Sequence, residues 1–191
     1  MRNKRSIEYD IAYMKMAIAL SELSYGERSK VGCIIVNCDG QIISQGYNGT
    51  PTKMNNCCEN VVCNSQWRHG CIRTSEAPNP SIDQCRGCDY VQLTTKKEVL
   101  NAESNAIVKC AKNGCGTTNN CTLYVTLGPC YDCAKLIIQA GVKRVVYNTE
   151  YRDMCGLNFL VDYGIEVDKI DIEKKTVTRI KRNGERDASN S

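Results

Sequence analysis

Two short stretches constrain this chain more than any other feature: Asn101-Ala102-Glu103 and, further along, Pro129-Cys130-Tyr131-Asp132-Cys133. Residues three apart on a helix share a face, so Cys130 and Cys133 can present two sulfur atoms to one point. A helix N-terminus favours thiolate over thiol, and the thiolate is the form that binds metal. With a third ligand and an open position for water, this is the pattern of a catalytic zinc site.

Glu103 and Asn101 raise separate points about that site. Glu103 is placed to take a proton from an activated water and to return it to the reaction. Asn101, near the start of the same helix as Glu103, could offer a third ligand, but an amide is a poorer zinc ligand than an imidazole or a thiolate. We therefore expect weakened or absent metal, and an activity loss of at least the roughly 10- to 100-fold seen for changes around metal ligands.

Cysteine is the unusual part of the composition, with 14 in a chain of 191 residues. No signal-peptide core or membrane-length apolar run is present, so we expect a cytoplasmic protein without membrane contact, in which metal ligation explains cysteines better than disulfides. Cys33, Cys110 and Cys121 lie in apolar patterns and are expected in the core. The net charge of +4 would help an anionic small substrate and is no argument for nucleic-acid binding.

Residues 55–93 hold six of the cysteines and the single histidine, without sustained hydrophobic periodicity. An unstructured loop of this length is uncommon in a compact domain unless something fixes it, and zinc would do so. Cys85 and Cys88 have the spacing of a zinc knuckle. Their partners are left open among Cys57, Cys58, Cys63, His69 and Cys71. Free surface thiols are the alternative.

Hydrophobic periodicity elsewhere alternates between helices and strands. We expect helices at 6–25, 98–113, 130–139 and 158–162. We expect strands at 31–36, 41–47, 121–127, 143–148 and 165–170. This order predicts a three-layer α/β/α domain over residues 1–171, with a mixed five-stranded sheet and the cysteine-rich segment inserted. Residues 172–191 would be a polar tail, with one edge strand at 176–180.

The stretches resemble the zinc-dependent deoxycytidylate (dCMP) deaminases of phages and eukaryotes, in the cytidine and deoxycytidylate deaminase superfamily. The similarity covers about residues 5–170 and rests on 29–32, 46–51, 101–107 and 123–135. The family signature is His-x-Glu followed by Pro-Cys-x-x-Cys, so Asn101 stands in the place of a histidine. The resemblance implies a cytidine-deaminase-like fold and hydrolysis of dCMP to dUMP for dTTP synthesis. It also implies the host cytoplasm as the location if the chain is phage-encoded.

The resemblance also implies roles for individual residues. Glu103 would be the proton shuttle, and Cys130 and Cys133 the zinc ligands, with Asn101 at the third position. Tyr151 would stack on the pyrimidine, unless it is an ordinary loop tyrosine. A monophosphate needs cationic and hydroxyl donors at one end of the pocket, and the loop at 28–30 supplies both unless it is merely solvated. The residues expected to bind substrate are Arg28, Ser29, Lys30, Asn48, Ala102 and Tyr151.

Regulation and assembly follow from the resemblance alone. On local grounds the turn at 46–51 is an ordinary loop. By resemblance, the part formed by Gly46, Tyr47, Asn48 and Gly49 belongs to a site where dCTP activates and dTTP inhibits, with Mg²⁺ accompanying the nucleotide. The protein would be a homo-oligomer, expected to be a hexamer. The cysteine-rich segment would hold a second, structural zinc.

Two other functions stay open. One is another zinc deaminase, acting on a nucleoside, a guanine-type base or tRNA adenosine, although no basic stripe favours RNA. The other is a non-catalytic nucleotide-binding or zinc-binding regulator. Asn101 itself has three explanations: a deliberate inactivating substitution, natural or accidental variation with weakened zinc binding, or completion of the site by His69.

Overall fold

The computed structural model describes residues 4–63 and 91–182. Six strands form one mixed sheet in the order β2-β1-β5-β6-β7-β8. Their bounds are β1 Gly32–Val36, β2 Ile42–Tyr47, β5 Thr122–Leu127, β6 Arg144–Thr149, β7 Glu166–Asp171 and β8 Thr176–Arg179. β5, β6 and β7 are parallel neighbours, whereas β2–β1, β1–β5 and β7–β8 are antiparallel pairs. The mixed sheet is confirmed, and β8, expected as an edge strand, makes six strands rather than five.

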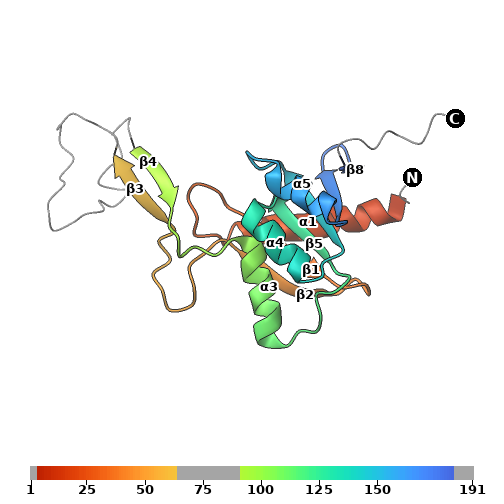
Figure 1. Ribbon diagram of the computed structural model, residues 1–191, viewed down its shortest axis with the longest axis horizontal. Coiled ribbons are helices and arrows are strands. Elements are labelled where there is room, and N and C mark those ends of the chain that lie inside the picture. Colours follow the sequence, from red (N-terminus) through yellow and green to blue (C-terminus); the bar gives the residue numbers. More distant parts are fainter. Residues whose placement is uncertain (1–3, 64–90, 183–191) are drawn as a thin grey trace.

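Helices cover both faces of this sheet (Figure 1). Their bounds are α1 Lys4–Ser21, α3 Ala102–Asn113, α4 Tyr131–Gln139 and α5 Cys155–Asp162. α1 lies on one face, where Met14 and Ala17 share a core with Ile34. The other three helices cover the opposite face, whose core includes Cys33 and Ile35. Successive residues of β1 therefore serve two different cores, as strand geometry requires, and the α/β/α layering is confirmed.

The ends of four strands lie along the side of the sheet formed by the carboxyl ends of β5 and β6. Because β5 and β6 are parallel, their carboxyl ends lie side by side, the usual position of a site in an open α/β sheet. β1 runs antiparallel to β5, so the start of β1 lies at the same edge, as does the end of β2. Loops from distant parts of the sequence meet there, at 26–31, 48–50, 128–130 and 150–153.

Two helices are shorter than expected because residues next to them form hydrogen bonds with the turn after β2 instead of continuing the helix. α1 ends at Ser21 rather than near residue 25, since Ser24 Oγ and Tyr25 N both donate to Asn48 O, at 3.2 Å and 3.4 Å. α3 begins at residue 102 rather than 98, since Gly49 and Leu100 exchange two backbone hydrogen bonds of 2.9 Å and 3.2 Å. Tertiary pairing overrides helix propensity at both places.

α5 is longer than expected and begins at Cys155 rather than residue 158. Asp153 explains the earlier start, because its Oδ1 accepts a 2.8 Å hydrogen bond from the Cys155 N–H. An acidic acceptor just before a helix satisfies one of its unpaired amides. Cys33, Cys110 and Cys121 are all buried, which confirms their placement in the core.

Two further strands, β3 (Glu59–Cys63) and β4 (Val91–Thr95), form an antiparallel arm that projects from the main sheet (Figure 1). The sequence did not predict the arm, because five residues are too few to show a clear alternation. His69, Cys71, Cys85 and Cys88 lie outside the described residues. Within 4–63 and 91–182, no helix is both long and apolar enough to cross a membrane.

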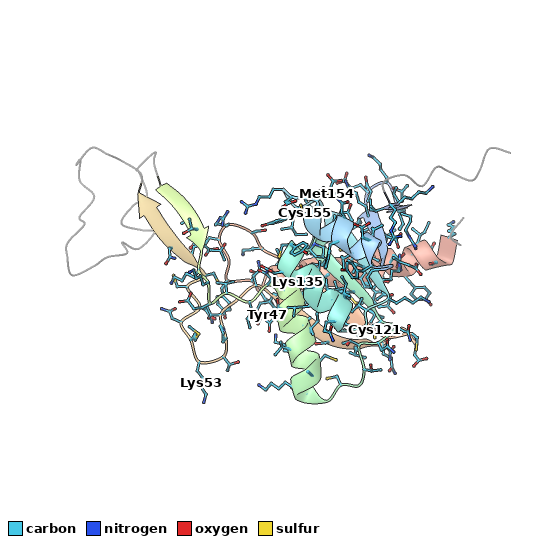
Figure 2. The ribbon with its side chains drawn as sticks, in the orientation of Figure 1. Tyr47, Lys53, Cys121, Lys135, Met154 and Cys155 are labelled. Carbon is cyan, nitrogen blue, oxygen red and sulfur yellow. The ribbon has the colours of Figure 1, made fainter. Side chains whose placement is uncertain are left out.

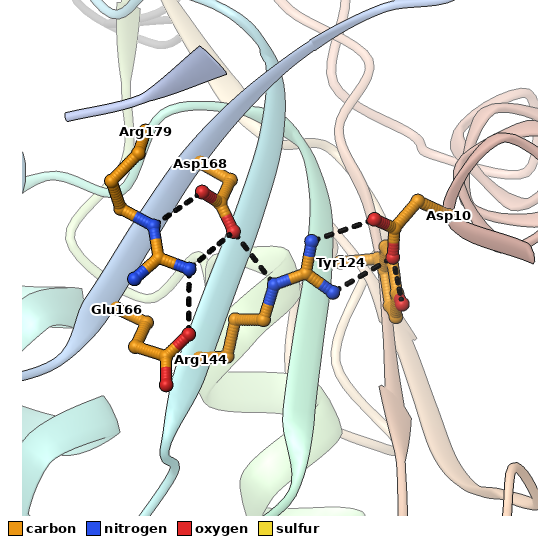
Figure 3. Close-up of polar contacts among 6 residues, drawn as sticks. All are labelled: Asp10, Tyr124, Arg144, Glu166, Asp168 and Arg179. Atoms are coloured by element: carbon orange, nitrogen blue, oxygen red, sulfur yellow. Dashed lines mark hydrogen bonds and ion pairs between the residues drawn. The ribbon is translucent and has the colours of Figure 1, made fainter. Parts of the chain in front are cut away.

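A chain of charges joins α1 to the carboxyl-terminal strands (Figure 3). Arg144 donates 2.7 Å hydrogen bonds to both carboxylate oxygens of Asp10 and another to Asp168. Arg179 then donates to the other oxygen of Asp168 at 2.6 Å. Tyr124 donates to Asp10 at 2.7 Å. Both aspartates are buried, and these partners offset the cost of removing their charges from water.

Candidate active site

A cavity of about 170 Å³ opens at the sheet edge where the loops meet. It is lined by Gly26, Arg28, Ser29, Val31, Asn48, Cys58, Glu59, Thr95, Val99, Asn101, Glu103, Leu127, Gly128, Cys130 and Tyr151. Most of the residues predicted for the site are therefore in one lining. Cys133 and Ala102 are buried next to lining residues of their own helices, whereas Lys30 is exposed and not part of the lining.

The cysteine pair is held at the start of α4. Cys130 occupies the N-cap position with extended backbone (φ −71°, ψ 170°), and Cys133 is buried in the first turn. Gly156 lets α5 approach this start closely, because a Cβ there would lie 2.2 Å from Pro129 O and 2.7 Å from the Cys130 carbonyl carbon. The pair is thus fixed by contact with a neighbouring helix as well as by its own.

Asn101 completes a convergence of three side chains. Its Nδ2 donates to Cys133 Sγ at 3.2 Å and to Cys130 Sγ at 3.6 Å. Ser104, one turn into α3, has its hydroxyl 3.8 Å from Cys133 Sγ. Within the described ranges, no group of three His, Cys, Asp or Glu side chains is arranged to hold a metal ion.

The donor set fits zinc at two positions and poorly at the third. Both sulfurs lie within 3.6 Å of one nitrogen atom, so they converge as two ligands of one tetrahedral ion must. Asn101 directs its N–H groups at them, and an amide nitrogen is a donor without acceptor capacity. The Asn101 amide group would have to rotate by half a turn to direct Oδ1 at an ion bound between the two sulfurs.

The cysteine pair shares a single negative charge. Hydrogen bonding from the Cys133 thiol, helped by backbone N–H donors, lowers the pKa of Cys130 to about 6. Giving that hydrogen bond, together with burial, holds the pKa of Cys133 far above the ordinary thiol range. The thiolate is therefore Cys130, the more accessible of the two.

Glu103 lies in the first turn of α3 and is buried beside the cysteine pair. Burial raises its pKa to about 7, and the charge on Cys130 adds to the effect. A carboxyl group that titrates near neutral pH can both accept and release a proton in a catalytic cycle. This behaviour is the one required of the predicted proton shuttle.

The end of β2, which leads into the turn at 48–50, is fixed against the start of α3. A Cβ at Gly46 would lie 2.2 Å from Ala102 O and 2.6 Å from Ala106 N, so only glycine permits this approach. Asn105 Nδ2 donates to Tyr47 O at 2.9 Å. The Tyr47 ring lies beside α3 (Figure 2), with Lys109 Nζ 5.0 Å from its centroid.

Asn48 connects this turn to two walls of the cavity. Its Oδ1 accepts a 2.9 Å hydrogen bond from Ala102 N, at the start of α3. Its Nδ2 donates to Ser29 O at 3.2 Å, in the loop before β1. Tyr151 lines the cavity from the loop after β6, with the Arg152 guanidinium 5.5 Å from its ring centroid.

The arm contributes residues that the sequence did not indicate. Glu59 and Thr95, at the base of the arm, line the cavity, as does Cys58. No motif or periodicity marks Glu59 or Thr95, because their partners are Glu27 and Arg28, far away in the chain. Of the residues predicted to hold a structural metal, Cys58 is buried in this wall and Cys57 is exposed beside it.

The family model for the cytidine and deoxycytidylate deaminase zinc-binding region matches residues 7–149. This chain belongs to that family. Deoxycytidylate deaminase of Enterobacteria phage T4 is 32% identical over 182 residues, covering 87% of this chain and 91% of the phage protein. Deoxycytidylate deaminase of Saccharomyces cerevisiae is 31% identical over 160 residues, covering 83% of this chain. The chain spans 44% of the length of that yeast relative.

Solved structures agree with the family assignment. The structure of dCMP deaminase from the cyanophage S-TIM5, in complex with dCMP and dUMP, is 37% identical and superposes with a TM-score of 0.63. The match covers 83% of this chain and 94% of the cyanophage protein. The predicted resemblance and the cytidine-deaminase-like fold are therefore confirmed.

Proposed function

We propose that this deaminase-family chain hydrolyses dCMP to dUMP and ammonia. The observation that carries the proposal is that Glu103, Cys130 and Arg28 line one cavity, with Cys133 joined to Cys130 through the Asn101 amide. A carboxyl group that titrates near neutral pH, beside the Cys130 thiolate, suits proton transfer at the nucleobase, and a guanidinium suits a phosphate at the opposite end of a nucleotide. The relatives named deoxycytidylate deaminase support the same substrate.

Each side chain then has a definite task. Zinc, held by Cys130 and Cys133 and weakly by the Asn101 amide, would supply activation of water for attack at C4 of the pyrimidine. Glu103 takes a proton from the attacking water and delivers it to ring atom N3; it then moves the proton of the new C4 hydroxyl to the amino group, which leaves as ammonia while C4=O forms. Tyr151 stacks on the base.

The remaining substrate residues position the sugar and phosphate. Asn48, already bonded to Ala102 and Ser29, is next to the sugar, which fixes the distance between base and phosphate sites. Arg28 and Ser29 bind the 5′-phosphate by charge and hydrogen bonding. Lys30, exposed beside them, adds positive charge at the entrance.

Restoring the third ligand tests this proposal. Asn101→His should raise bound zinc to about one ion at this site and raise dCMP turnover by roughly 100-fold or more. Zinc per chain is measured by mass spectrometry and dUMP by chromatography, with deoxycytidine, guanine and a tRNA anticodon stem as competing substrates. The double variant Asn101→His/Glu103→Gln is the control and should bind zinc without turnover. Zinc uptake by Asn101→His without dCMP turnover would contradict the proposal.

A second candidate is a non-catalytic nucleotide-binding regulator. The contact of Asn101 Nδ2 with both sulfurs favours it, since the amide satisfies the pair in the absence of a third ligand. This candidate predicts nucleotide binding without turnover, even in Asn101→His. The same experiment therefore separates the two.

We further propose that the turn Gly46, Tyr47, Asn48 and Gly49 senses dCTP as activator and dTTP as inhibitor, with Mg²⁺, in a cytoplasmic homohexamer. The attachment of the turn to the start of α3 supports this, because any movement of Asn48 would reach Ala102 directly. The segment 55–93 would hold the second zinc. Equilibrium dCTP binding and sedimentation of the protein with and without each nucleotide test these statements.

A further inference from the structure

The base of the arm holds Arg28 from two directions. Glu59 and Thr95 are direct partners in the β3–β4 ladder, so their side chains share one face of the arm. Glu59 Oε1 accepts hydrogen bonds from the backbone N–H groups of Glu27 at 3.1 Å and Arg28 at 3.3 Å. Thr95 Oγ1 accepts a 3.0 Å hydrogen bond from the Arg28 guanidinium. One rung of a two-stranded ladder thus fixes both the main chain and the side chain of one arginine.

The Glu59 carboxylate is an unusual group to place here, since it is only 6% exposed. Burying a carboxylate is costly unless donors surround it, and the two backbone amides supply charge-assisted hydrogen bonds. Gly26 also borders the carboxylate, because a Cβ there would be in ordinary contact with Glu59 Oε1, at 3.5 Å. The carboxylate therefore sets the path of the loop at 26–28 rather than pairing with a cation.

Thr95 is the complementary half of this arrangement. It is neutral, so it fixes the direction of the guanidinium without cancelling its charge. Among the described residues no carboxylate forms an ion pair with Arg28, although the residue lines a cavity that also contains Glu59 and Glu103. An arginine held in one direction with its charge available is prepared to bind an anion, because less side-chain freedom is lost on binding.

We propose that Glu59 and Thr95 are positioning residues that hold Arg28 for the phosphate of a nucleoside monophosphate, and so set the preference for nucleotide over nucleoside. The inference deepens the proposed function and rests on it. By this inference the foot of the arm takes part in substrate selection. The arm carries none of the residues that act on the pyrimidine.

Binding of the product pair dUMP and 2′-deoxyuridine tests the inference on the chain as it exists, because neither compound is consumed. Titration calorimetry should show that dUMP binds more tightly than deoxyuridine. Thr95→Val keeps the side-chain shape and removes the hydroxyl, so dUMP affinity should fall about 10-fold, the effect of losing one charge-assisted contact. Deoxyuridine affinity should stay unchanged. Thr95→Ser keeps a hydroxyl and should bind dUMP like the parent.

Glu59 is tested by a second matched pair. Glu59→Ala removes the acceptor of both backbone hydrogen bonds, and dUMP affinity should fall by about 10-fold or more while deoxyuridine is unaffected. Glu59→Gln retains an acceptor oxygen and should recover most of the loss. If Glu59→Ala does not fold, the two Thr95 variants decide the matter alone.

The outcomes separate this inference from the proposed function. If the parent prefers dUMP and Thr95→Val keeps the same preference, the positioning role is wrong and the proposed substrate stands. A Thr95→Val variant that loses both ligands equally also contradicts it, since that result indicates general damage. If the parent itself binds dUMP no better than deoxyuridine, the nucleotide substrate is wrong, and the positioning role with it.

Discussion

This chain differs from its family signature at one residue, Asn101, where the signature has a histidine. Its neighbours keep the contacts that the site needs: Ala102 N is bonded to Asn48, Asn105 to Tyr47, and Glu103 is buried beside the cysteines. The amide nitrogen lies 3.2 Å from one sulfur and 3.6 Å from the other. The Asn101 amide is therefore part of a hydrogen-bonded cluster at the position where the family signature has a histidine.

The buried Glu103 should make the metal-free protein less stable as pH rises. Its folded-state pKa, about 7, is above the ordinary 4.5, so the unfolded chain ionises first as pH increases. Below pH 4.5 both states are protonated and the residue has no effect. Between 4.5 and 7 stability falls by about 1.4 kcal/mol per pH unit, or about 3 kcal/mol in all.

Glu103→Gln removes this dependence. The difference in unfolding free energy between the variant and the parent should therefore shift by about 3 kcal/mol in favour of the variant as pH rises from 4.5 to 8. Urea unfolding in the presence of a chelator measures the difference at each pH. Equal pH profiles for the two proteins would show that Glu103 ionises normally and would remove the basis for its shuttle role.

Sequence reasoning anticipated the cysteine and glutamate side of the cavity better than the side formed by the arm. The helix-start positions of Glu103, Cys130 and Cys133 follow from short spacings, so their meeting could be anticipated. Glu59 and Thr95 could not be anticipated. Their contacts depend on strand pairing across an inserted segment and on backbone amides about thirty residues upstream, and neither leaves a local pattern.

At the scale of elements, the turn after β2 sets where two helices stop and start. Asn48 O accepts hydrogen bonds from Ser24 and Tyr25 just after α1. Gly49 pairs with Leu100 just before α3. Hydrophobic periodicity predicted both helices but not these limits, because the competing partners are tertiary. The order of helices and strands could be predicted because helices and strands have different hydrophobic periods. The residues at which they begin and end depend on tertiary contacts.

Gly46, near the end of β2, should be the least replaceable residue of this region. In Gly46→Ala the new Cβ would meet Ala102 O at 2.2 Å, and since both sides are backbone, α3 must move. We expect a loss of about 3 kcal/mol in unfolding free energy. Gly49→Ala is the matched control and should stay within about 1 kcal/mol of the parent, because its Cβ meets only Tyr25 Cδ2 at 3.8 Å.

Urea denaturation of both glycine variants gives the comparison. Equal stability of Gly46→Ala and Gly49→Ala would mean that the turn and α3 are not in rigid contact. The route from Asn48 to the active site that we propose for effector response would then be lost.

At the scale of the whole molecule, the charged chain of Figure 3 connects the first helix to the last strands of the sheet. It joins α1 to β6 through Asp10 and Arg144, and joins β6 to β7 and β8 through Asp168 and Arg179. These residues come from opposite ends of the sequence and from one side of the sheet. The network therefore fixes the edge strand β8 to the same body as the first helix.

Arg144→Met should destabilise the fold strongly. It leaves Asp10 and Asp168, whose side chains are 3% and 1% exposed, without that guanidinium, and we expect a loss of about 3–5 kcal/mol. Lys169→Met is the control. Lys169 forms an ion pair of the same 2.7 Å length with Glu150, but the two side chains are 40% and 52% exposed, so the loss should be within about 1 kcal/mol.

Thermal and urea unfolding measure both variants. If Arg144→Met is no less stable than Lys169→Met, the buried network contributes to geometry rather than to stability.

The span of that network also bears on how the chain is made. Asp10 and Arg144 are 134 residues apart, so a ribosome releases α1 long before it synthesises the arginine that binds it. Among the described elements made before β5, β1 and β2 are the ones that pack substantially on α1. A nascent chain stalled before β5 therefore displays the apolar side of its first helix, and such surfaces are the ones that chaperones hold.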